Sequence, residues 1–432
     1  MFALVFIAGI GVLGWLSTPP RNSAPPRRLI VFIFVFTFAG ILPSHAGVLI
    51  QVIALCGGFI EWLSVPRTER RGSAVVVLVT VLIAVWALLI FHPNVPDFTT
   101  GLLGFRKSVL AVAGVVLGLS IRQRYKIQAE RIVVAAVFAA VVVSIVGHLW
   151  VPEITNLVST READEYTATY ANEERLQGVF AGPFHAALAG VFLFSWAVVR
   201  FKSSRWQASV VGMAGLAAIA LSLVRTSYIS LVLVVVAFVL LSGTISGVLK
   251  RATLVILAGL VSLFSVLAVR DDLAAVIFSI GDFATDGRFL NRFPGYMKAL
   301  EMISASPIVG WGSGSSGDTL GSEFSMGLHV TSHNLLIKFA VEGGILGLAG
   351  FCAVIIAILK SLPQKTADGQ LALMSLVGLF GFGITGSAIE ALPVTYLIFV
   401  IVGIHIPARL ERATEAPLPS VSLAGTATTQ GT

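Results

Sequence analysis

Residues 332–347 read SHNLLIKFAVEGGILG and join a long polar segment to an apolar run that continues to residue 359. As a helix, this run is long enough to cross a hydrocarbon core of roughly 30 Å. His333 and Asn334 then stand at the water-facing rim of a membrane helix, where an imidazole can move a proton while reaching a lipid-borne substrate. The stretch therefore predicts a membrane protein with chemistry at one rim.

Apolar runs of the same kind recur along the whole chain, which is 56% hydrophobic and 12% charged. They predict an all-α, polytopic membrane helix bundle of about 12–13 transmembrane helices. The expected spans are 1–16, 29–44, 46–64, 74–92, 103–121, 132–151, 183–199, 209–224, 227–247, 252–269, 335–359, 370–389 and 393–408.

The basic residues indicate how these spans are oriented. Most of the 29 Lys and Arg residues lie in short loops after every second span, and the connections at 43–46 and 93–102 contain none. The basic loops are therefore expected to be cytoplasmic. The net charge of +7 reports orientation in this way and does not indicate nucleic acid binding.

This parity leaves two long segments, 152–182 and 270–334, on the outer side. The second contains Tyr296, Leu300 and Ile303 at helical spacing, which predicts a short helix lying on the membrane surface. The membrane unit extends over residues 1–412. Residues 413–432, rich in Ala, Thr, Ser and Pro, predict a disordered cytoplasmic tail.

Cations on the outer side need a reason, because they oppose the charge bias. Arg225 lies in the tight outer turn between two spans, where it either snorkels to lipid headgroups or clamps an anion with its guanidinium fork. Arg288 and Arg292 are either solvated loop charges or part of the same clamp. The glycine-rich turn at 307–314 lacks the Lys-Ser/Thr ending of a nucleotide P-loop, which favours a flexible connector.

His333 is either a structural residue at the helix start or a general base, and Asn334 is equally able to cap the helix. Glu342 is too deep to orient His333 and is expected to contact another membrane helix. Glu390, near the outer end of a later span, could pair with Arg225 or tune His333. The spacing of His, Cys, Asp and Glu indicates no metal site, so no metal or other cofactor is expected.

Four sequence blocks resemble the O-antigen ligase and polysaccharide polymerase family of bacterial inner-membrane glycosyltransferases. Residues 222–226 look like its Ser-x-Ser-Arg turn, with Val224 in place of the second serine. Residues 292–300 and 307–312 look like its Arg-x-x-x-Trp-x-x-Ala-Leu and Pro-x-x-Gly-x-Gly block, with Tyr296 in place of the tryptophan. The most specific block contains His333, Asn334, Glu342, Gly344 and Gly347. Residues 175–180 resemble an Arg-x-x-Gly-x-Phe block, although Gly182 and Phe184 stand where the family has asparagines.

The resemblance covers roughly residues 175–350 and implies a GT-C-like transmembrane glycosyltransferase domain. The implied donor is a glycan on undecaprenyl pyrophosphate, presented at the periplasmic face of the inner membrane. Arg225 and Arg292 would hold the pyrophosphate, with Arg288 as the reserve candidate, and His333 would be the catalytic base. Asn334, Glu390 and Arg175 are the supporting candidates.

The acceptor stays open. A polymerase, which we favour slightly, would extend an O-antigen or exopolysaccharide chain and work with chain-length regulator proteins, whereas a ligase would use lipid A-core. A secondary transporter or a flippase for lipid-linked oligosaccharides is more remote. A transporter usually places ionisable residues near the middle of the bilayer, and a flippase should line a central cavity with cations.

Overall fold

The computed structural model describes residues 27–41, 44–67, 69–151, 169–170, 173–241, 247, 292–317, 320–325 and 327–407. In these ranges the regular elements are helices, apart from a two-residue antiparallel ladder of β1 (Thr169–Tyr170) and β2 (Glu173–Glu174). The chain is an all-α polytopic membrane protein, as the sequence predicts. Arg288, the predicted spans 1–16 and 252–269, most of the predicted outer segment 152–182, residues 270–291 of the second outer segment and the tail lie outside the described residues.

Each predicted span within the described residues contains a helix. In the part of the chain that the structure describes, four helical segments are long and apolar enough to cross a membrane: Phe98–Ser120, Gln123–Trp150, Pro183–Arg200 and Leu335–Ser361. The helices are α2 (Arg27–Thr37), α3 (Ser44–Ser64), α4 (Ser73–Leu89), α5 (Phe98–Ser120), α6 (Lys126–Trp150), α8 (Pro183–Arg200), α9 (Arg205–Ser222), α10 (Arg225–Leu240), α15 (Leu335–Ser361), α16 (Ala367–Gly383) and α17 (Val394–Ile404), with short 3-10 turns η1 (Ala39–Ile41), η2 (Gln123–Tyr125) and η4 (Ala388–Glu390). The total of 12–13 crossings stays a prediction.

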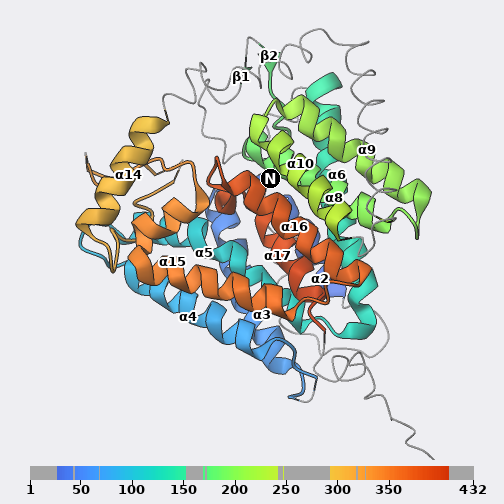
Figure 1. Cartoon of the computed structure of the whole chain (residues 1–432), viewed down its shortest axis with the longest axis horizontal. Coiled ribbons are helices and arrows are strands. Elements are labelled where there is room, and N and C mark those ends of the chain that lie inside the picture. The colour runs from blue at the N-terminus through green and yellow to red at the C-terminus, as the bar shows by residue number, and fades with distance from the viewer. Residues whose placement is uncertain are drawn as a thin grey trace, which may run out of the picture.

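Helices α16 and α17 lie between two groups of helices, one with α3, α4, α5 and α15 and the other with α8, α9 and α10 (Figure 1). Every residue of α17 is buried, as expected for a helix that is apolar on all sides. Its backbone approaches α5 closely. A Cβ added at Gly118 or Gly403 would overlap a carbonyl oxygen of the other helix, so small residues are required at this crossing.

Helix α14 (Phe293–Ala305) corresponds to the short surface helix predicted in the second outer segment. It buries Ala299 and Met302 and exposes Phe293, Met297 and Leu300. These three exposed apolar residues repeat every three to four positions and so form one stripe, which suits a helix whose outer face meets lipid.

Helix α15 is broken at Gly344, whose φ of 59° and ψ of −156° are not helical. The break removes the regular bond from the Ile345 amide to the Val341 carbonyl. The glycine-rich turn supplies a new partner for each of these two groups. The Ile345 amide donates to the Pro307 carbonyl at 2.8 Å, and the Trp311 amide donates to the Val341 carbonyl at 2.9 Å.

The same turn also reaches Glu342, because the Gly312 amide donates to the Glu342 carbonyl at 3.0 Å. Polar backbone at membrane depth must be satisfied within the protein, and this turn provides the partners. The glycine-rich turn is therefore not the flexible connector that its composition favours. It is inserted into the hydrogen-bond ladder of α15.

We predict that Gly344→Ala destabilises the protein by more than about 2 kcal/mol, because a side chain at this φ is strained and its Cβ would overlap the Ile308 carbonyl. Thermal unfolding in detergent measures the effect. Gly350→Ala, on the same helix but with only a 3.4 Å contact to Leu82, is the control and should unfold like the wild type. Equal unfolding temperatures for both variants would contradict the proposed role of the break.

Candidate functional site

The loop between α16 and α17, residues 384–393, brings several predicted site segments together. Arg292 donates from Nη1 to the Thr385 carbonyl at 3.1 Å, and Asn334 donates from Nδ2 to the neighbouring Ile384 carbonyl at 2.9 Å. The hydroxyls of Thr226 and Thr385 are 2.7 Å apart. The starts of α10, α14 and α15 therefore meet at this loop, which we call the site end of the bundle.

His333 is half-buried and has a φ of 44°, a conformation that is uncommon for residues other than glycine and is often found at functional positions. Burial and the Arg292 guanidinium lower the pKa of His333 to about 4, and the Glu390 carboxylate opposes this shift. The imidazole is thus neutral at physiological pH and able to accept a proton. Asn334 is also the helix cap, since its Oδ1 accepts from the Leu336 and Ile337 amides.

Arg225 is the first residue of α10 and follows a tight turn in which Leu223 has a left-handed φ of 51°. The structure confirms this turn between the two predicted spans. Arg225 is half-buried, and its neighbour Thr226 contacts the 384–393 loop. The positive end of the α10 dipole and the guanidinium thus occur together at the site end, an arrangement suited to an anion.

Arg175 is buried against the end of α9. Its Nε donates to the Ser222 carbonyl at 3.0 Å, and its guanidinium lies 5.3 Å from the Phe184 ring centroid. Phe184 stands where the family has an asparagine, so the departure from the motif supplies a cation–π contact in this chain. Arg175 holds the turn before Arg225 in place.

Glu390 forms an ion pair with Lys338, with Oε1 and Nζ 3.0 Å apart. Lys338 also donates to Glu342 at 2.6 Å and to the Ser316 carbonyl at 2.5 Å. Glu342 accepts further bonds from Trp86 Nε1 at 2.9 Å and from Ser108 Oγ at 2.6 Å, on α4 and α5. The predicted role of Glu342 as a contact to another helix is confirmed.

Sequence reasoning did not assign a role to Lys338. The signal was available, because a lysine and a glutamate four residues apart on a helix lie on the same face, and here both lie in an apolar run. The fold of the 384–393 loop was not available from the sequence, since it depends on contacts between distant helices. Arg288 lies outside the described residues, so its role stays a prediction.

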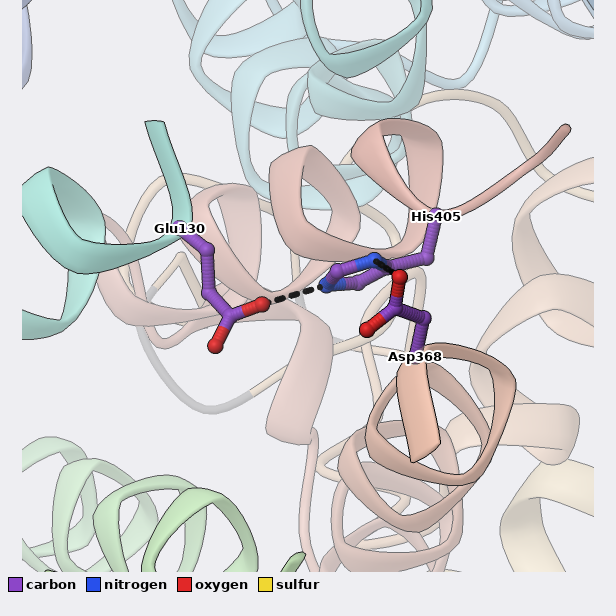
Figure 2. A group of neighbouring side chains, drawn as sticks. All are labelled: Glu130, Asp368 and His405. Atoms are coloured by element: carbon purple, nitrogen blue, oxygen red, sulfur yellow. Dashed lines mark ion pairs between the residues drawn. The ribbon is translucent and has the colours of Figure 1, made fainter. Parts of the chain in front are cut away.

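A second charged cluster lies elsewhere in the bundle. Glu130, Asp368 and His405 offer ligand atoms within 4.8 Å of one another, a spacing that could hold a metal ion (Figure 2). His405 lies between the two carboxylates, with Nε2 3.0 Å from Glu130 and Nδ1 3.8 Å from Asp368. The three residues are far apart in sequence, which explains why residue spacing gave no sign of them.

Cations already hold both carboxylates of this cluster. Arg200 binds Glu130 at 2.5 and 2.8 Å and Asp368 at 2.7 Å, while Lys126 binds Asp368 at 3.0 Å. Trp196 donates to Glu130 at 2.7 Å. A metal ion would have to displace these partners, so the cluster fits an ion-pair clamp between helices better than a metal site.

This ion-pair clamp marks the opposite end of the bundle. Helix α8 starts beside the Arg175–Phe184 contact and ends at Arg200, and its 18 residues extend over about 27 Å. Buried Arg71 lies at the clamp end as well, where it donates to the Ile404 carbonyl at 3.1 Å and the Ile406 carbonyl at 2.7 Å, at the end of α17. Basic residues from three predicted cytoplasmic loops thus gather at one end, away from His333.

Residues 208–352 match a family model described as O-Antigen ligase. This match supports an assignment to the O-antigen ligase and polymerase family. It agrees with the resemblance in three of the four sequence blocks, because residues 175–180 lie outside the match. The matched region contains Arg225, Arg292, His333 and the break in α15. No curated protein gives a significant match to the chain.

We predict that Arg200→Met destabilises the protein by about 3 kcal/mol, because it leaves the buried Glu130 and the partly buried Asp368 carboxylates without their shared cation. Arg205→Met, which removes an exposed arginine one helix along, is the control and should have little effect. Unfolding in detergent, with and without added Zn²⁺ or EDTA, measures both. A wild-type protein that gains stability from Zn²⁺ and loses it in EDTA would instead identify the cluster as a metal site.

Proposed function

We propose that this chain is a glycosyltransferase of the bacterial inner membrane. It moves a glycan from undecaprenyl pyrophosphate to an acceptor hydroxyl at the periplasmic face. The observation that carries the proposal is the meeting of Arg292, Asn334 and Thr226 at residues 384–385, since this brings the two arginine-bearing segments and the histidine-bearing segment to one end of the bundle.

The arginines would act on the leaving group. When the anomeric carbon separates from the phosphate oxygen, the electron pair and negative charge leave with the pyrophosphate. Arg225 and Arg292, helped by the start of α10, would hold these oxygens in bidentate fashion. Arg288 is the reserve for the second position. Guanidinium groups in this role would supply the charge that a metal ion supplies in other transferases.

His333 would act on the acceptor. Its neutral imidazole takes the proton from the acceptor hydroxyl as that oxygen bonds to the anomeric carbon. Burial and Arg292 keep the imidazole neutral beforehand, while Glu390 favours the imidazolium that forms. Asn334 holds the start of α15 to the 384–393 loop and so fixes the neighbouring His333.

The contents of the clamp end and the site end indicate how the chain is oriented in the membrane. Arg71, Lys126 and Arg200 gather at the clamp end, and basic residues are retained on the cytoplasmic side of membrane proteins. This supports a periplasmic position for the site end, where lipid-linked glycans and an acceptor could meet. The exposed apolar stripe of α14 would lie against the outer leaflet.

The same chemistry serves a polymerase or a ligase. We favour polymerisation of O-antigen or exopolysaccharide slightly, with a chain-length regulator as a partner, and transfer to lipid A-core is the alternative. An assay with a defined undecaprenyl-pyrophosphate oligosaccharide distinguishes them. A polymerase extends the donor without lipid A-core, whereas a ligase needs it.

His333→Ala should lower kcat for glycan transfer by about 10²–10⁴-fold, the usual range for loss of a general base, while the protein still inserts and unfolds normally.

Arg225→Lys and Arg292→Lys should each lower the rate of glycan transfer by about tenfold or more, because a point charge does not replace a guanidinium fork. Arg205→Lys, at an exposed arginine on α9, is the matched control for the arginine variants. Near-normal product from His333→Ala would reject the base assignment, and wild-type rates for Arg225→Lys would return that residue to a lipid-facing role.

The pH dependence of kcat/KM gives a separate prediction. A general base is active when deprotonated, so activity should be lost as pH falls through the pKa of His333, about 4, and not near the ordinary histidine value of 6.5. Arg292→Gln removes a cation that lowers this pKa, so its acidic limb should move to higher pH. A wild-type limb near 6.5, or an unmoved limb in Arg292→Gln, would contradict the proposed electrostatics.

A further inference from the structure

We propose that Lys338 is a positioning residue for the transfer reaction and fixes both Glu390 and the backbone that carries His333. This inference rests on the proposed function, in which His333 is the base. Lys338 lies one turn into α15 and is 1% exposed, yet it carries a charge at membrane depth. Such a group is costly unless it is paired, and a functional role is the first hypothesis for it.

The first connection runs through Glu390. Lys338 Nζ lies 3.0 Å from Glu390 Oε1, and the Gly317 backbone lies close to both groups. A side chain at Gly317 would collide with Glu390 Oε1 and lie 3.0 Å from Lys338 Nζ, so glycine leaves room for this contact. Glu390 in turn acts on the imidazole of His333. Lys338 therefore helps to position a carboxylate whose charge acts on the proposed base.

The second connection runs through the backbone before His333. Lys338 binds the Ser316 carbonyl at 2.5 Å, and the Ser316 hydroxyl donates to the Ser332 hydroxyl at 2.9 Å. Ser316 also pairs with Val330 in a parallel bridge. Ser332 directly precedes His333, whose left-handed φ needs support from its surroundings. Lys338 thus anchors the segment that imposes this conformation.

A purely structural role is the competing account, in which Lys338 only neutralises Glu342. Glu342 already accepts bonds from Trp86 and Ser108, so the structural account does not need the contacts to Glu390 and Ser316. The two accounts predict different results for the removal of Lys338. A structural role lowers stability alone, whereas a positioning role lowers kcat in the protein that remains folded.

The experiment compares Lys338→Met, Glu390→Gln and the double variant as folded proteins in detergent or nanodiscs, with a defined undecaprenyl-pyrophosphate oligosaccharide. Lys338→Met should lower kcat about 10–100-fold with KM for the donor within about twofold, as expected when reacting groups are misplaced. The double variant should be no slower than Lys338→Met, because the Lys338–Glu390 ion pair is already lost in Lys338→Met. Lys360→Met, an exposed lysine on the same helix, should match the wild type.

A wild-type kcat for folded Lys338→Met, or losses that multiply in the double variant, would overturn the inference. If Lys338→Met does not fold, Lys338→Met with Glu342→Gln removes one unpaired carboxylate and keeps an acceptor for Trp86 and Ser108. The same kcat loss is expected there. Inactive His333→Ala beside fully active Lys338→Met would reject this inference alone, whereas active His333→Ala would reject the proposed function.

Discussion

The break in α15 is the constraint on which the site depends. Without the regular bond at Gly344, the Val341 carbonyl and the Ile345 amide need partners inside the membrane, and the 307–312 turn supplies them. The break therefore draws the outer segment down against the helix. That segment includes Ser316, which pairs with Val330 and donates to Ser332. The turn therefore also fixes the residues before His333.

Charge is distributed so that the ions of both buried clusters have partners. At the clamp end, Arg200 and Lys126 neutralise Glu130 and Asp368, and this joins α6, α8 and α16. Near the site end, Lys338 stands between Glu342 and Glu390. Both clusters carry the desolvation cost of charge in a low-dielectric medium, but the second includes Glu390, whose charge acts on the proposed base. This difference separates a structural clamp from a candidate functional network.

Much of this arrangement could be predicted from the sequence, because it depends on local signals. Apolar runs predicted the helices, the Asn334 cap followed from its position before an apolar run, and the His-Asn block indicated the family. The 384–393 loop could not be predicted, since its contacts to Arg292 and Asn334 join segments far apart in the chain. The Glu130–Asp368–His405 cluster escaped notice for the same reason, and the glycine-rich turn was misread because composition does not show what a turn contacts.

The surroundings of His333 meet two opposed requirements. A base must be neutral before the reaction, and burial together with the Arg292 guanidinium keeps it so. The same cation, however, disfavours the imidazolium that forms when the proton is taken. Glu390 offsets this effect, and a carboxylate can do so only if its distance from the imidazole is fixed. The Lys338 ion pair helps to hold the Glu390 carboxylate in place. In the proposed mechanism Arg292 and Lys338 thus act on His333 with opposite effects, Arg292 directly and Lys338 through Glu390.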